Sequence, residues 1–174
     1  MRGLSDAGHQ QSQRVADLLE GEDVAAIVSS PYSRAIQTVR PLAKRLGMAI
    51  QIDPELRERH LSSGPLDDFK ASLEATWRDF DLVYPGGESS AAAQARVGRA
   101  IGQIAARGDS RNVVIATHGN ALALFLRTLD SRVDFAFWSR MSIPDVYAVA
   151  THPENAWSYL RVWPEGSGPD LWPN

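Results

Sequence analysis

His118 stands where the sequence pattern changes from strand to helix. It follows the short β-branched run 112–116, typical of a buried strand, and precedes Gly119 and an apolar run from Ala121 that predicts a helix. His118 is therefore expected at the carboxyl end of a parallel strand, the edge of an open α/β sheet where ligands bind. An imidazole there could contact phosphate, bind a metal, or act as a nucleophile or general base. A histidine that only caps or packs at the strand end is the structural alternative.

Arg34 and Glu58 are two further candidates for chemistry. Arg34 is predicted in the first turn of a helix that follows the strand 24–28, where a guanidinium and free helix N–H groups together form an anion site. A surface arginine is the alternative. Glu58 lies in the charged, irregular segment 53–65 and could protonate a leaving group if burial raises its pKa. Solvated ion pairs are the alternative, which spacing alone favours.

Asn120, two residues after His118, could hydrogen-bond a phosphate oxygen or cap the helix that it enters, the cap being the commoner role. His9 and His152 are expected to be exposed. The four histidines show no HxH or HExxH spacing and the chain has no cysteine. We therefore expect neither a metal site nor a cofactor.

The elements that must position these residues read as one α/β domain, 1–164, followed by a loose tail, 165–174. The pattern predicts helices over about 6–19, capped by Ser5; 31–46, capped by Ser30, with Pro31 in its first turn and a kink at Pro41; 66–81; and 91–106, capped by Ser89. It predicts strands over 24–28, 49–52 and 112–116, and hairpin-like or edge strands around 146–149 and 157–163.

Composition narrows the class of protein. The chain has 174 residues, 44% hydrophobic and 22% charged, with a net charge of −3, which argues against a nucleic-acid binder and leaves an anionic small molecule open. No apolar run approaches the length of a membrane span, so no membrane partner is expected. The first five residues lack the apolar core of a signal peptide, and the cytoplasm is the expected location.

Five segments taken together resemble the histidine phosphatase superfamily, the phosphoglycerate-mutase-like proteins. They occur in that family's order, at 4–12, 29–38, 56–59, 86–89 and 117–120. The resemblance implies a three-layer α/β/α fold with a mostly parallel central sheet. It also implies a nucleophilic histidine, in an Arg-His-Gly motif at the end of the first strand, that attacks phosphorus and forms a phosphohistidine. A second histidine and two arginines then hold the phosphoryl oxygens, and an acid protonates the leaving oxygen.

Carried over to this chain, the resemblance assigns four residues. Arg34 matches the second arginine, His118 the second histidine, and Glu58 the acid. Asn120 is similar to the amide that follows Thr-His-Gly in mutase-type members. Arg34, His118 and Asn120 would thus hold phosphate, and Glu58 and His118 would take part in catalysis.

The Arg-His-Gly motif has no counterpart in the sequence, which begins almost at the segment that follows the first strand. Met1, Arg2 and Gly3 supply an arginine and a glycine without a histidine between them. We therefore expect a sheet without its first strand, a gap in it, and little or no turnover. A start placed too late is favoured over a degenerate or rearranged member.

The leading hypothesis is a phosphatase-like domain for phosphate monoesters. Hydrolysis is favoured over mutase-type phosphotransfer because no insertion rich in basic residues follows Glu58. A catalytically inactive module that binds a phosphate ligand, and a generic α/β domain, are the alternatives. The expected partner is phosphate or a small phosphorylated molecule, and an incomplete sheet favours a homodimer. Trp77, Phe80 and Tyr84 could line a leaving-group pocket or pack in the core.

Overall fold

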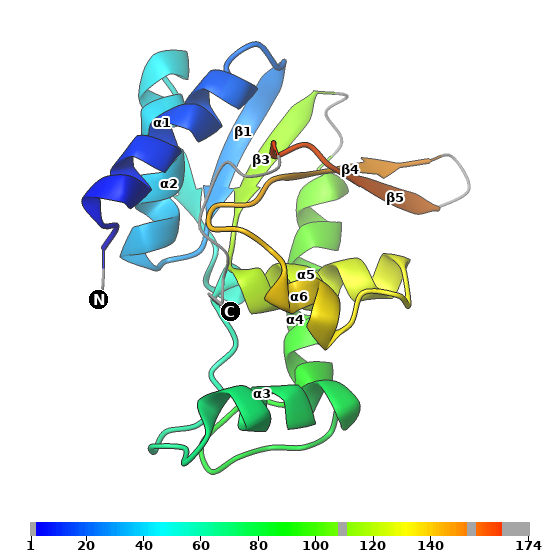
Figure 1. Cartoon of the computed structure of the whole chain (residues 1–174). Helices are drawn as coiled ribbons and strands as arrows, with labels where there is room; N and C mark the ends of the chain where they lie inside the picture. Colours follow the sequence, from blue (N-terminus) through cyan, green and yellow to red (C-terminus); the bar gives the residue numbers. More distant parts are fainter. Residues whose placement is uncertain (1–2, 108–110, 153–155, 165–174) are drawn as a thin grey trace.

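A parallel sheet of three strands, in the order β2-β1-β3, lies at the centre of the fold (Figure 1). The computed structural model describes residues 3–107, 111–152 and 156–164. The sheet strands are β1 (Val24–Ser29), β2 (Ile50–Ile52) and β3 (Asn112–Ala116). The helices are α1 (Asp6–Leu19), α2 (Ser33–Leu46), η1 (Pro54–Leu56), α3 (Phe69–Arg78), α4 (Ser90–Ala105), α5 (Gly119–Leu129) and α6 (Phe135–Ser139). An antiparallel hairpin of β4 (Tyr147–Thr151) and β5 (Trp157–Arg161) completes the described elements.

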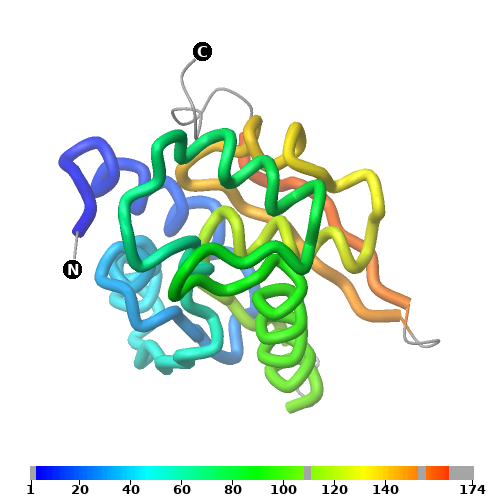
Figure 2. The backbone as a smooth tube through the Cα atoms, turned by 90° about the horizontal axis from the view of Figure 1, so that it is seen from below, coloured from blue at the N-terminus to red at the C-terminus, as the bar shows by residue number. Residues whose placement is uncertain are grey.

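Successive side chains of a strand point to opposite faces, and this alternation divides the core in two. Ile27 of β1 packs with α1 and α2 on one face. Its neighbour Val28 packs with α3, α4 and α5 on the other. Figure 2 shows α1 and α2 on one side of the sheet and α4 on the other. The predicted three-layer α/β/α fold with a parallel central sheet is confirmed.

Most predicted helix starts are confirmed. Ser5 caps α1 by accepting from the Gly8 N–H at 3.2 Å, and Ser89 caps α4 by accepting from the Ala92 N–H at 3.0 Å. Asp68 caps α3, which is shorter at both ends than the predicted 66–81. The short helix α6 was not predicted.

The predicted start of α2 is wrong. α2 begins at Ser33, with Tyr32 at its N-cap, rather than at Pro31 with Ser30 as the cap. The reason is that Ser30 continues the strand: its N–H donates to the carbonyl of Ala116 at 2.8 Å. Its hydroxyl is hydrogen bonded with His118, so the serine belongs to the site rather than to the helix. The helix continues through Pro41.

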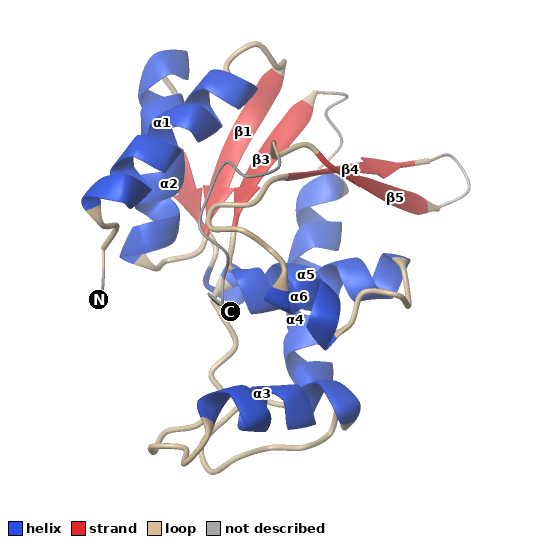
Figure 3. Cartoon of the chain, viewed as in Figure 1, coloured by secondary structure: helices blue, strands red, loops and turns tan. Residues whose placement is uncertain are grey.

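Among the described strands, β3 pairs with β1 on one edge and with no strand on its other edge. The β4–β5 hairpin forms a sheet of its own, separate from the parallel one (Figure 3). The expected gap in the sheet stays a prediction. The predicted tail, 165–174, lies outside the described residues. In the described part of the chain, no helix has the length and apolar character needed to cross a bilayer.

Candidate functional site

Two strand–helix junctions meet at one edge of the sheet. β1 and β3 are parallel, with Ser29 opposite Ala116, so their carboxyl ends lie side by side. The segment that leads from β1 into α2 and the turn that leads from β3 into α5 therefore face the same space. Figure 1 shows this edge turned toward the part of the chain that carries α3. The expected location of the site at the carboxyl edge of a parallel sheet agrees with this geometry.

His118 is the N-cap residue of α5 and is buried, with 8% of its surface exposed. Its Nε2 lies 2.7 Å from the Ser30 hydroxyl, and its ring meets the ring of Tyr32 edge to face at 5.0 Å between centroids. Burial, with a smaller contribution from the charges of Arg34 and Arg96, lowers the pKa of His118 to about 3. The imidazole is therefore neutral at pH 7 when no anion is present.

Arg34 occupies the first turn of α2, as predicted, and is half-buried. Its guanidinium carbon lies 4.9 Å from the centroid of the Tyr32 ring, a cation–π geometry. The described residues give this guanidinium neither an ion pair nor a hydrogen bond. Its donors are therefore available to an anion at the edge that also carries His118.

Glu58 lies against the N-terminus of α5 rather than in a solvated ion pair. Its Oε1 accepts the N–H groups of Arg59 at 2.9 Å and Ala121 at 3.0 Å, and its Oε2 accepts that of Asn120 at 3.2 Å. Burial raises the pKa of Glu58, while the three N–H donors and the charge of Arg34 oppose that rise. The carboxyl group thus interacts with the charge of Arg34. Its raised pKa means that it is protonated more readily than an ordinary glutamate.

Asn120 does not cap α5 with its side chain. The N-cap position belongs to His118, which makes no side-chain capping bond. The Asn120 amide is buried, with 6% of its surface exposed, and neither its oxygen nor its nitrogen has a partner among the described residues. A buried amide without a partner is unusual and suits a group that bonds to a ligand.

Arg96 of α4 holds the segment that carries Glu58. It is 3% exposed and forms a bidentate ion pair with Glu88, in which Nε lies 2.8 Å from Oε1 and Nη2 lies 2.7 Å from Oε2. The same guanidinium donates to the backbone carbonyls of Glu55 and Arg57, the latter at 3.1 Å. Burial raises the pKa of Glu88, but the Arg96 hydrogen bond and neighbouring arginine charges outweigh it and hold that pKa below its usual value.

Two more side chains fasten the same segment. The buried Arg59 donates to the hydroxyls of Ser90 at 2.5 Å and Thr76 at 2.8 Å. Thr117, at the end of β3, donates to the carbonyl of Leu56 at 2.8 Å. The backbone on both sides of the site carboxylate is therefore fixed to α3, α4 and β3.

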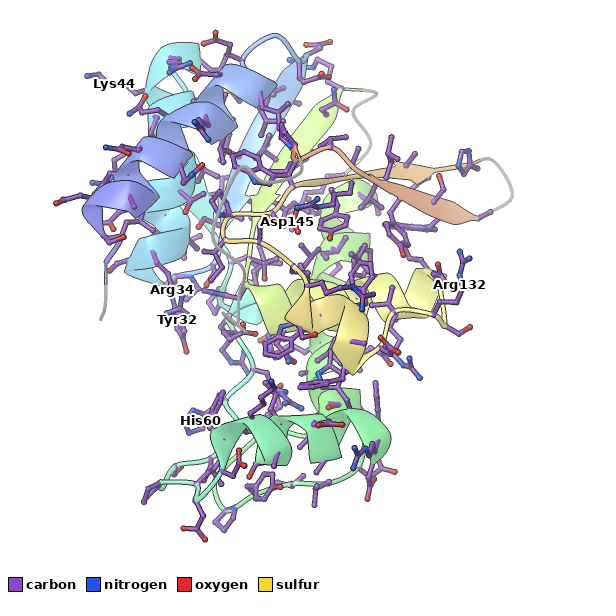
Figure 4. The ribbon with its side chains drawn as sticks, viewed as in Figure 1. Tyr32, Arg34, Lys44, His60, Arg132 and Asp145 are labelled. Carbon is purple, nitrogen blue, oxygen red and sulfur yellow. The ribbon has the colours of Figure 1, made fainter. Side chains whose placement is uncertain are left out.

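The other three histidines lie elsewhere. As expected, His9 and His152 are exposed, and His60 is exposed as well, near the Ser63 hydroxyl at 3.4 Å. Figure 4 shows Tyr32 and Arg34 side by side at the N-terminal end of α2, with His60 lower in the view, on the segment that leads to α3. Among the described residues, no cluster of histidine and carboxylate side chains could hold a metal ion.

Of the three aromatic residues proposed for the leaving-group pocket, two pack in or against the core and the third also lines a groove. Trp77 is 7% exposed and packs in the core, and Phe80 packs against that core. Tyr84 also packs there, and it lines an open groove of about 430 Å³ together with Leu66 and Ser72. The core role is therefore right for Trp77 and Phe80.

Ser30, Tyr32 and Arg96 are site residues that the sequence analysis missed as such. Ser30 looked like a helix cap because it precedes a proline. Arg96 has no distinguishing pattern, since an arginine within a helix is usually exposed. The resemblance covered the segment 29–38 but assigned only Arg34 within it.

Comparison with known proteins gives a consistent result. The family model of the histidine phosphatase superfamily, branch 1, matches residues 2–162. A glucosyl-3-phosphoglycerate phosphatase from Mycolicibacterium vanbaalenii is 31% identical over 140 residues, which cover 72% of this chain and 62% of that protein. Phosphoglycerate mutase-like protein 4 of Arabidopsis thaliana is 30% identical over 131 residues, 68% of this chain and 56% of that protein.

Among solved structures, mycobacterial glucosyl-3-phosphoglycerate phosphatase in complex with VO3 superposes with a TM-score of 0.75 at 26% identity. The match covers 92% of this chain and 86% of that structure. The chain spans about 60% of the length of the curated relatives that it matches.

Proposed function

Because the chain belongs to the histidine phosphatase superfamily, we propose that its site binds the phosphoryl group of a phosphate monoester between Arg34 and His118. One observation carries the proposal: a half-buried guanidinium without an ion pair or hydrogen bond among the described residues lies at the same sheet edge as a buried, neutral imidazole. A phosphate dianion would give the guanidinium its counter-charge. The similarity to a phosphatase structure in complex with VO3, a phosphate-like anion, supports this choice of ligand.

Each site residue has a role in this proposal. Arg34 grips two phosphoryl oxygens with its fork, and His118 and the Asn120 amide bond to the others as negative charge builds. Glu58 protonates the leaving oxygen, a role that its raised pKa supports. Two N–H groups at the start of α5 donate to the Glu58 carboxyl group in the unliganded chain. When Glu58 moves toward the leaving oxygen, these N–H groups become available to the bound phosphoryl group.

Hydrolysis also needs a nucleophile. The resemblance implies a histidine in an Arg-His-Gly motif, and none of the four histidines of this sequence other than His118 lies at the site. We therefore expect this chain by itself to bind phosphate with little or no turnover. A segment that paired in parallel with the edge of β3 left open by the described strands would end beside His118. That edge is our proposed location for the nucleophile.

A phosphoglycerate-mutase-type phosphotransferase is a second candidate, favoured by the relative of that name. Hydrolysis remains the preferred activity, since no basic insertion follows Glu58. We further propose a cytoplasmic location and a homodimer. The edge of β3 that has no partner among the described strands supports the homodimer.

Calorimetric titration with inorganic phosphate tests the binding proposal. Arg34→Ala and His118→Ala are expected to lower the affinity at least tenfold, whereas Arg40→Ala, an exposed arginine on the same helix, is the matched control and should leave it unchanged. Equal losses in all three variants, or no binding by the unmodified chain at millimolar phosphate, would overturn the proposal.

Turnover of p-nitrophenyl phosphate separates the enzyme from the binding module. We expect none above background. Turnover that His118→Ala abolishes would show instead that this chain carries a complete catalytic site.

A further inference from the structure

Tyr32 lies between the two side chains to which phosphate binding is assigned. The edge-to-face contact of its ring with the His118 imidazole measures 5.0 Å between centroids, at an interplanar angle of 62°. The Arg34 guanidinium carbon lies 4.9 Å from the centroid of the same ring. One aromatic ring therefore contacts an imidazole from the β3–α5 junction and a guanidinium from α2.

The backbone holds this ring in place. Tyr32 is the N-cap of α2, and its carbonyl accepts the N–H groups of Ala35 at 2.9 Å and Ile36 at 3.2 Å. Its own N–H donates to the Ser30 hydroxyl at 3.3 Å, and that hydroxyl bonds to His118 at 2.7 Å. The ring thus extends from a backbone position that is hydrogen bonded, through the Ser30 hydroxyl, to His118.

The contacts involve the ring and not the hydroxyl. Within the described residues, the Tyr32 hydroxyl makes no hydrogen bond, and both neighbours contact the π system. A guanidinium is attracted to the face of an aromatic ring, and a second ring prefers to meet it edge to face. No described carboxylate or hydroxyl forms an ion pair or hydrogen bond with the Arg34 guanidinium, so the ring is the group in direct contact that holds it beside the site.

We propose that Tyr32 is a positioning residue, whose ring orients both the Arg34 guanidinium and the His118 imidazole for a phosphoryl group. The proposal rests on the proposed phosphate-binding function for its ligand. The preorganisation itself is a property of the chain without ligand. Fixing the two groups before binding lowers the entropy lost when phosphate binds, and removing the ring is expected to weaken binding.

Two variants separate the ring from the hydroxyl. Tyr32→Phe keeps the ring and should bind inorganic phosphate as the unmodified chain does. Tyr32→Leu removes it and should bind about two- to fivefold more weakly, the range of a partly exposed cation–π contact. Tyr159→Leu, a half-buried tyrosine of the β4–β5 hairpin, is the control and should leave the affinity unchanged.

NMR of the unliganded chain supplies a readout that a merely structural role would not move. The NMR order parameter of the Arg34 Nε–H bond should fall in Tyr32→Leu and keep its value in Tyr32→Phe, because it reports how firmly the guanidinium is held and not the ring current of the tyrosine. Tyr32→Met, an unbranched side chain of similar length, serves for the ring-less arm if the leucine variant does not fold.

Each outcome decides the proposal. Loss of affinity in the leucine variant with a lower Arg34 order parameter, both restored by phenylalanine, supports it. An unchanged Arg34 order parameter in the leucine variant, or a phenylalanine variant as weak as leucine, overturns it. If the unmodified chain binds no phosphate, the proposed function fails, while the NMR comparison still decides whether Tyr32 holds the Arg34 guanidinium.

Discussion

Acidification of a phosphate-free solution should destabilise the protein through His118. The pKa of this histidine is about 3 in the folded chain, below its ordinary value of 6.5, mainly because it is buried. Between these two pH values the unfolded chain binds a proton at this residue that the folded chain does not. The free energy of unfolding therefore falls as the pH falls from about 6.5 toward 3.

The size of the effect follows from the shift. One pKa unit corresponds to about 1.36 kcal/mol, so acidification from pH 6.5 to pH 4 should remove about 3 kcal/mol through His118 alone. Carboxylates whose pKa is lowered, such as that of Glu88, add a loss of their own near and below pH 4.5.

A comparison with His118→Gln isolates the contribution of the histidine. Urea unfolding at pH 7.0, 6.0, 5.0 and 4.0 should show a steep fall for the unmodified chain and a shallower one for the variant, which has no group to titrate at that position. The two curves should differ in slope by up to about 1.4 kcal/mol per pH unit below pH 6. Parallel curves would refute a buried, neutral histidine at the end of β3.

Three further predictions concern the residues around the histidine. Arg96→Met removes the buried guanidinium and leaves the half-buried Glu88 carboxylate with the longer ion pair to Arg57 at 3.8 Å, so it should lower the free energy of unfolding by about 2–3 kcal/mol in a urea titration. Arg78→Ala breaks an exposed pair and should change that free energy by less than about 1 kcal/mol, and equal losses would contradict the role of the buried pair. Ser30→Ala removes the hydroxyl partner of the site imidazole and should cost about 1–3 kcal/mol in the same assay, whereas an unchanged value would show that this hydrogen bond is dispensable. Glu58→Gln removes any negative charge that this carboxyl group carries near Arg34 and should bind phosphate at least as tightly as the unmodified chain in calorimetry, whereas weaker binding would show that the carboxyl group does not compete with the anion.

The sequence predicts the central fold well because its signals are local. The β-branched run 112–116 and the caps Ser5 and Ser89 act through neighbouring residues, and each element appears where expected. The start of α2 shows the limit. Pro31 suits a first helical turn, but a hydrogen bond of Ser30 with His118, 88 residues away, and a sheet contact with Ala116 keep the chain extended there.

The candidate site divides in the same way. Arg34 and His118 could be predicted because each follows a strand directly, and Glu58 because the resemblance covers it. The contacts of Tyr32 with Arg34 and His118, and the hydrogen bonds of Arg96 to the segment that carries Glu58, could not. Both depend on tertiary contacts between elements that are distant in the sequence, and no local period carries that information.

A crystal structure of the chain grown with saturating inorganic phosphate tests the central claim most directly. The account predicts tetrahedral density between the Arg34 guanidinium and the His118 imidazole, with the Asn120 amide bonded to it. Well-ordered Arg34 and His118 side chains with no anion between them, in crystals whose phosphate concentration exceeds the measured Kd, would contradict it.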